Sequence, residues 1–188
     1  MSEKNKKQII IYAAKKIMAA KGYEKASIKE IAKEAEITSG LIHYYFKNKE
    51  EILTAVLMDA CNQHVIELQN RQERAPSEDI STEAIRVPKE KVGKEPDWYK
   101  LRYELFAIGL RNSSHADGVN TVLEYERESI STILTSIFPE SQEIESLASI
   151  LLACFDGLAL QKLLNPEFDL DNAYDVLQKL VLTLKDTR

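Results

Sequence analysis

The sequence predicts an all-α protein, with an N-terminal three-helix helix-turn-helix domain followed by a C-terminal helical bundle. Apolar residues recur at helical spacing through most of the 188 residues, and no stretch alternates as a strand would. Helix-start signals follow one another closely within the first 50 residues. With 44% hydrophobic residues, a chain of this length can bury a core without disulfides, and its five prolines and six glycines exclude a collagen-like protein.

The first two helices are predicted from their apolar faces and their ends. Apolar residues from Ile10 to Met18 share one helical face, and Gly22 can end this helix in a left-handed C-terminal cap. Ser27 and Glu30 have the S-x-x-E spacing of a capping box, which predicts the start of a second helix.

The third helix follows after a turn of a few residues, with Thr38 or Ser39 as its cap. Asn48 and Glu51 repeat the capping-box spacing and predict a long fourth helix that runs to about Arg74. Three short helices joined by a tight turn are the helix-turn-helix pattern, in which one helix is presented to the major groove of DNA.

The rest of the chain is predicted to be helical after one long connection. Residues 75–97 contain three of the five prolines and many charges, which predicts a mobile loop with a short helix around Ser81–Val87. Four further helical patterns follow, at residues 97–111, 116–138, 141–164 and 171–185.

Charge is divided unequally along the chain. Residues 1–50 carry 11 lysines against 6 glutamates, a net charge of +5, whereas the remainder has a net charge of −10. A basic N-terminal module on an acidic body suggests contact with a polyanion such as DNA. A lysine-rich helix face exposed to solvent explains the same charges equally well.

The sequence predicts neither an enzyme nor a metal or cofactor site. It contains no glycine-rich phosphate loop and no G-x-S-x-G motif, and His115 has no triad partners. Cys61 and His64 are three residues apart, but no further ligands follow nearby. The only other cysteine is Cys154, and two distant thiols are typical of a reducing compartment. No apolar run approaches the roughly 18–20 residues of a membrane span, so we expect a soluble cytoplasmic protein that does not enter membranes.

The run from Ser27 to Leu53 resembles the tetracycline-repressor (TetR) family of bacterial transcriptional regulators. The matching positions are Gly22-Tyr23, Ile31-Ala32, Ala35, Ile37, Gly40, Ile42, Tyr45, Phe46, Lys49, Glu50 and Ile52-Leu53. The chain departs from the family pattern at Glu36, where glycine is usual, at His43, where tyrosine is usual, and at Leu41.

The resemblance implies a DNA-binding domain at residues 1–48 and a domain for effector binding and dimerisation at residues 49–188. The expected function is that of a ligand-responsive repressor, released from a palindromic operator in double-stranded DNA by an unknown small-molecule inducer. The alternatives are an all-helical interaction module without a role in DNA binding, or an enzyme that uses the helical body.

DNA contacts are expected from helix starts and from the exposed face of the third helix. The predicted residues are Ser27, Lys29, Thr38, Ser39, Gly40, Leu41, His43, Tyr44 and Lys49. Ser27 serves either as a cap alone or also as a phosphate donor, and Tyr45 faces either the core or DNA. Lysine is unfavourable for its own helix dipole at a helix start, which favours a phosphate contact for Lys49. Ile42 and Phe46 are predicted to face the core.

Two further sites are predicted in the C-terminal body. Apolar stripes on its last two helices predict a four-helix dimer interface or an intramolecular core, and the interface candidates are Leu147, Leu151, Cys154, Leu158, Val176 and Leu180. Aromatic residues after the proline-rich segment form either core or an effector pocket. The pocket candidates are Trp98, Arg102, Tyr103, Phe106 and Tyr125, with Glu104 and Glu124 as further polar contacts.

Overall fold

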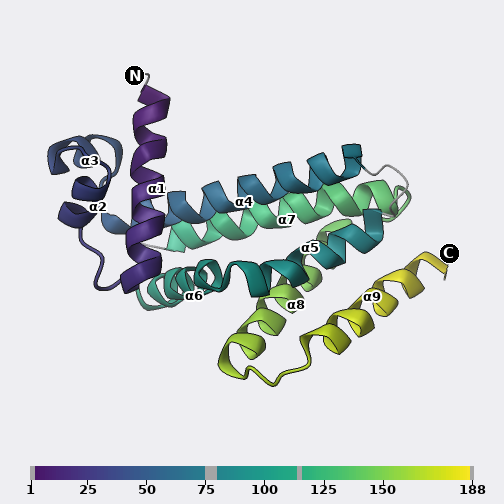
Figure 1. The fold of residues 1–188 in the computed structure, drawn as a ribbon. Coiled ribbons are helices and arrows are strands. Elements are labelled where there is room, and N and C mark those ends of the chain that lie inside the picture. The colour runs from purple at the N-terminus through teal and green to yellow at the C-terminus, as the bar shows by residue number, and fades with distance from the viewer. Residues whose placement is uncertain (1–2, 75–79, 114–115, 187–188) are drawn as a thin grey trace. The chain divides into compact units, whose positions relative to one another are not determined.

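A computed structural model describes residues 3–74, 80–113 and 116–186, and within these ranges the protein is all-α, as predicted (Figure 1). The N-terminal helices are α1 (Glu3–Lys21), α2 (Ile28–Glu34), α3 (Ser39–Tyr45) and α4 (Lys49–Arg74). They are followed by α5 (Ile80–Lys94), α6 (Pro96–Arg111), α7 (Ala116–Ile137), α8 (Ile144–Leu164) and α9 (Leu170–Asp186). The chain forms two compact units. One comprises the residues up to Asn62 together with Lys100–Leu123, and the other comprises Gln63–Tyr99 together with the residues from Glu124 onward.

The helix ends of the first unit form where the sequence predicts them. Gly22 follows α1 with a φ of +78°, in the left-handed region. The Ser27 hydroxyl accepts from the Glu30 backbone N–H at 3.3 Å, and the Glu30 side chain accepts from the Ser27 N–H at 3.1 Å, so both bonds of the capping box are made. Thr38, of the two candidates, caps α3 by accepting from the Leu41 N–H at 3.3 Å.

The core of the first unit joins α1, α2 and α3 to the start of α4. Its fully buried residues include Ile10, Ala14, Met18, Ile31, Ile42, Ile52 and Leu53. Burial of Ile42 and Phe46 confirms that this side of α3 faces the core. This unit extends past residue 48, because Gln8 of α1 donates to Asp59 of α4 at 2.7 Å and α6 also contributes.

The segment predicted as a loop is mostly helix, and this corrects the sequence analysis. Residues 80–94 form α5, and α6 begins directly afterwards at Pro96; residues 75–79 lie outside the described residues. Pro88 inside α5 removes one backbone N–H, while Ile85, Val87 and Val92 are buried along the helix. Pro96 occupies the first helical position, where no N–H donor is needed.

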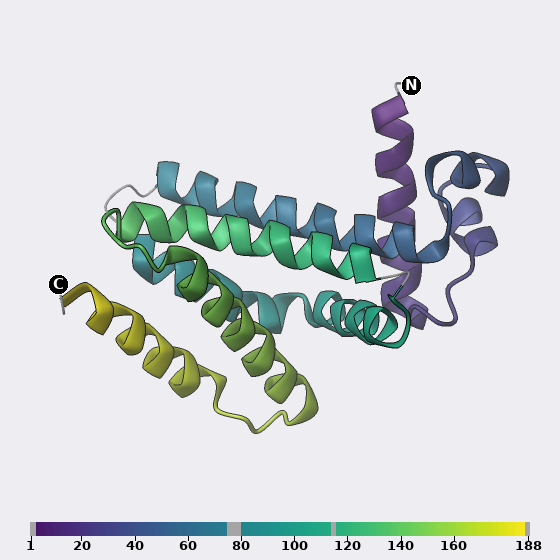
Figure 2. The ribbon, with the colours of Figure 1, turned by 180° about the vertical axis from the view of Figure 1, so that it is seen from behind.

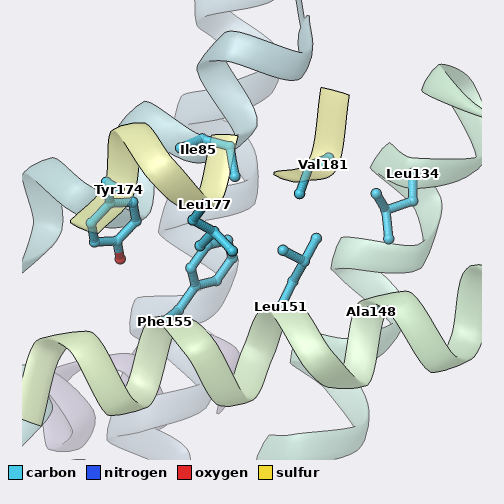
Figure 3. Packing of buried hydrophobic residues seen from close by; sticks show 8 residues of the cluster. All are labelled: Ile85, Leu134, Ala148, Leu151, Phe155, Tyr174, Leu177 and Val181. Atoms are coloured by element: carbon cyan, nitrogen blue, oxygen red, sulfur yellow. The ribbon is translucent and has the colours of Figure 1, made fainter. Parts of the chain in front are cut away.

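The core of the second unit joins α5 and α7 to α8 and α9. Its buried residues are Ile85, Leu134, Ala148, Leu151, Phe155, Tyr174, Leu177 and Val181 (Figure 3). The rings of Phe155 and Tyr174 stack with centroids 6.0 Å apart. The chain reverses after α8, so that α8 and α9 lie side by side (Figure 2).

Helix α8 is more apolar than the sequence analysis expected. By length and composition alone, Ile144–Leu164 is a helix that could cross a membrane, which corrects the expectation that no apolar run approaches that length. Five of its residues, Ala148, Leu151, Leu152, Phe155 and Ala159, are buried in the second unit. Apolar side chains therefore occupy more than the core-facing side of α8.

Candidate DNA-binding surface

The turn between α2 and α3 has the hydrogen bonds of a Schellman motif. The Ile37 N–H donates to the Ala32 carbonyl at 3.0 Å, and the Glu36 N–H donates to the Lys33 carbonyl at 3.2 Å. Glu36 takes the left-handed conformation at this turn, with a φ of +54°. This is the position where the family pattern has glycine, so the turn keeps the usual geometry with a residue that is strained there.

The side of α3 opposite Ile42 and Phe46 is open to solvent. Of the residues predicted to contact DNA, Thr38, Gly40, His43 and Tyr44 are exposed, and Ser39 and Leu41 are half-buried. Tyr44 is 71% exposed, and its ring meets the Tyr45 ring edge-on at 5.0 Å. A large exposed aromatic on a short helix is available to contact a base or a phosphate.

Gly40 has room for a side chain within the folded chain. An added Cβ would meet only the Thr38 Oγ1, at 3.9 Å, which is an ordinary contact. Glycine in a helix costs up to about 1 kcal/mol relative to alanine. Packing within the chain therefore does not demand glycine at this position.

The start of α2 carries an exposed lysine and a serine that is already hydrogen-bonded within the chain. Lys29 is exposed. Both the hydroxyl and the backbone N–H of Ser27 donate to the Glu30 carboxylate, which also binds the Lys21 ammonium. The hydrogen bond from Lys21, followed by those from Ser27, lowers the pKa of Glu30 to about 2. In this arrangement Ser27 acts as a cap, and a phosphate would have to displace Glu30 to reach its donors.

Lys49 lies at the start of α4 as predicted, but its ammonium is turned to the protein. It donates to the backbone carbonyls of Tyr23, Glu24 and Ala26 at 2.9, 3.3 and 3.1 Å. An ammonium has three N–H donors, and these contacts use all three. The structure thus gives Lys49 a role within the chain, which differs from the phosphate contact that the sequence predicts. Local sequence patterns cannot predict these contacts, because they join residues more than 20 positions apart.

The predicted effector residues are divided between the two units. In the first, the Arg102 guanidinium is fully buried and lies 4.6 Å from the centroid of the Phe106 ring, which meets the Tyr103 ring at 6.4 Å. Trp98 and Tyr125 belong to the second unit, where the Lys91 ammonium lies 3.4 Å from the Trp98 ring centroid. The structure therefore brings together three of the five candidates.

Glu104, predicted as a polar contact of the same pocket, instead accepts a hydrogen bond from the Tyr23 backbone N–H at 2.9 Å. The metal-site candidate Cys61 is buried, whereas the side chain of His64, like residue His115, lies outside the described part of the chain.

The predicted dimer residues are also divided. Leu151 is 4% exposed and belongs to the core of the second unit, and Leu147, Cys154 and Leu158 pack against that core. Val176 and Leu180 are exposed, as are Ile150, Leu160 and Leu164 of α8. The α8 residues that were predicted for the interface therefore face the core of the second unit. The exposed apolar residues of α8 lie on a different side of the helix.

The fold and this surface define a helix-turn-helix DNA-binding protein with a larger helical body. The family model for bacterial regulatory proteins of the tetR family matches residues 10–56. The nicotine-responsive transcriptional repressor HdnoR of Paenarthrobacter nicotinovorans is 28% identical over 178 residues, which make up 88% of each protein.

Two solved structures share the fold over nearly the whole chain. The multidrug binding protein EbrR, complexed with proflavin, is 27% identical, with a TM-score of 0.63 over 93% of this chain and 99% of that one. FadR from Bacillus subtilis, in complex with stearoyl-CoA, is 21% identical, with a TM-score of 0.68 over 92% and 96%. Residues 10–56 thus form a DNA-binding domain of the tetR family, and the chain is a DNA-binding transcriptional regulator.

Proposed function

We propose that the protein is a repressor that a small-molecule inducer releases from a palindromic operator. The exposed face of α3, with Gly40, His43 and Tyr44, is the observation that carries DNA binding. Two relatives support a small-molecule signal: HdnoR is nicotine-responsive, and EbrR was crystallised with proflavin. Similarity to regulators along the whole chain favours this function over an enzyme or an interaction module.

The proposed repressor is a homodimer that pairs through α8 and α9. Large apolar side chains on both helices are exposed in the single chain: Leu164 is 77% exposed, Leu180 62% and Ile150 58%. Helix α8 is also as apolar as a membrane-spanning helix, so much of its apolar surface is left uncovered. A second copy of the chain would cover these side chains in a four-helix interface. Two-fold symmetry would then place two recognition helices on two half-sites about one turn of DNA apart, roughly 34–36 Å, or somewhat more.

The effector is expected to bind near Arg102, Tyr103 and Phe106, where a guanidinium and two rings meet. Binding there would favour a dimer whose recognition helices no longer fit both half-sites. Trp98 is the sole tryptophan, so its fluorescence reports on the body from a single position.

The test begins by selecting the duplex that the purified protein binds best from a random-sequence library. Mass spectrometry of co-purifying small molecules supplies effector candidates, with proflavin and nicotine as first probes. A true inducer changes Trp98 emission and lowers affinity for the selected duplex over the same concentration range. It also binds the DNA-free protein more tightly by the same factor, because linkage is reciprocal. Failure to select any duplex would contradict the proposed function.

A further inference from the structure

The turn between α1 and α2 is held by side chains from two other helices of the first unit. The Lys49 ammonium, at the start of α4, donates to three carbonyl oxygens at 2.9–3.3 Å. These carbonyls belong to Tyr23, Glu24 and Ala26. From α6, the Glu104 carboxylate accepts the Tyr23 backbone N–H at 2.9 Å. A cation thus binds the acceptors of the turn, and an anion binds one of its donors.

The turn needs such partners because its backbone leaves a helix abruptly. The left-handed Gly22 ends α1 and directs the following carbonyls away from the helical hydrogen-bond pattern. The Tyr23 side chain is buried, and the Lys49 ammonium lies 4.2 Å from the centroid of its ring. Burial raises the pKa of the Tyr23 hydroxyl above its usual value.

The position of this turn determines where the recognition helix lies. Ala26, one of the carbonyls bound by Lys49, directly precedes Ser27, the residue that caps α2. Helix α2 packs against both α1 and α3, and its Ile31 and Ala32 are buried. A shift of the turn would therefore move the start of α2 and, through the short turn at Glu36, would move α3 as well.

We propose that Lys49 and Glu104 form a two-sided clamp on the α1–α2 turn and are positioning residues for DNA recognition. In this role Lys49 acts through the backbone of residues 23–26 and does not bind phosphate. The inference rests on the proposed function, because its readout is binding to a selected duplex. Glu104 belongs to α6 and lies two residues before the candidate effector residue Phe106. The proposed clamp therefore includes a direct hydrogen bond between α6 and the α1–α2 turn.

Two substitutions of Lys49 separate the clamp from a phosphate contact. Lys49→Arg keeps the positive charge, but a planar guanidinium cannot direct three N–H groups from one nitrogen to three carbonyls. Lys49→Met removes the charge and keeps a similar stem. Affinities for the selected duplex and for a random duplex of equal length are measured across a salt series. Lys94→Met, at an exposed lysine of α5 that is not among the predicted DNA contacts, is the charge-matched control.

The clamp predicts that both Lys49 variants lose specific affinity by about tenfold, equivalent to about 1.4 kcal/mol. Their salt slope and their affinity for the random duplex stay as in the wild type. A phosphate contact predicts the opposite: Lys49→Arg binds as the wild type does, and Lys49→Met lowers the slope by about 1. That second result would overturn the clamp.

Glu104 is tested by a conservative rescue. Glu104→Gln keeps an oxygen that can accept the Tyr23 N–H, whereas Glu104→Ala removes it. We expect Glu104→Ala to lower affinity for the selected duplex severalfold and to speed hydrogen exchange at the Tyr23 amide. We expect Glu104→Gln to have the affinity and the exchange rate of the wild type. Glu124→Ala, at an exposed glutamate on α7, controls for the loss of negative charge.

Circular dichroism establishes that each variant is folded, and the Lys49→Arg result decides the proposal if Glu104→Ala does not fold. If the wild type selects a duplex and the Lys49 and Glu104 variants bind it equally well, the clamp fails and the proposed function stands. If the wild type selects no duplex, the proposed function fails, and the clamp as a device for DNA recognition fails with it.

Discussion

Replacement of Gly40 by alanine is expected to stabilise the protein and weaken its binding to DNA. Gly40 is the second residue of α3, and an added Cβ would lie 3.9 Å from the Thr38 Oγ1 without a clash. Alanine is favoured over glycine by up to about 1 kcal/mol inside a helix and by less near its end. We therefore expect the free energy of unfolding to rise by about 0.5–1 kcal/mol.

The same methyl group lies on the exposed face of α3, where we propose that the backbone approaches the DNA. An obstruction there should cost about tenfold in affinity for the selected duplex, or about 1.4 kcal/mol. The two effects have opposite signs, so a general loss of folded protein cannot imitate them. Urea denaturation measures the first effect, and a fluorescence-anisotropy titration of labelled duplex measures the second.

Gly93→Ala is the matched control, because Gly93 is an exposed helical glycine in α5 with no atom within 4 Å of an added Cβ. It should gain stability and bind DNA unchanged. If Gly40→Ala binds the duplex as tightly as the wild type, the backbone of α3 does not approach DNA closely at this residue. If Gly40→Ala lowers the free energy of unfolding, the backbone at residue 40 has a conformation that alanine cannot adopt without strain.

Three further predictions concern the turn, the capping box and the dimer. Glu36→Gly should raise the free energy of unfolding by about 1 kcal/mol, because glycine tolerates a φ of +54°; an unchanged urea midpoint would contradict this. NMR titration should place the Glu30 carboxyl near pH 2, and Lys21→Ala should raise its pKa toward 4.5. Because the folded-state pKa is lowered, the stability contributed by Glu30 is complete above about pH 4.5 and is lost as the pH falls toward 2. Leu180→Glu should yield folded monomers in analytical ultracentrifugation, whereas Lys179→Glu, one residue away, should stay dimeric; a dimeric Leu180→Glu protein would place the interface elsewhere.

The helix ends of the DNA-binding module were predictable because their determinants are local. A capping box needs only residues three apart, and the left-handed cap after α1 needs only a glycine. The core side of α3 was predictable for the same reason, since Ile42 and Phe46 are one helical turn apart and both are buried. At each of these positions, the hydrogen bond or the packing follows from residues within four positions in the chain.

The prediction of a loop was wrong for residues 80–94, because prolines were weighted over apolar spacing. Pro88 removes a single backbone hydrogen bond, and burial of Ile85 and Val92 offsets that loss within α5. The inward-facing stripe of α8 was not predictable in this way. Apolar residues surround that helix, so spacing alone cannot distinguish Leu151, which is buried, from its exposed neighbour Ile150.

Lys49 shows why a local rule can find a residue and still miss the contacts that it makes within the chain. A lysine at a helix start is unfavourable for that helix, which requires a negative group nearby. Phosphate meets this requirement, but so do backbone carbonyls, which carry partial negative charges and lie in the turn that follows α1. The carbonyls of Tyr23, Glu24 and Ala26 lie within 3.3 Å of the ammonium only after α1 and α4 have packed together. The charge at the start of α4 therefore serves the end of α1, and the same argument applies to Glu104, whose carboxylate meets the N–H that the turn leaves free.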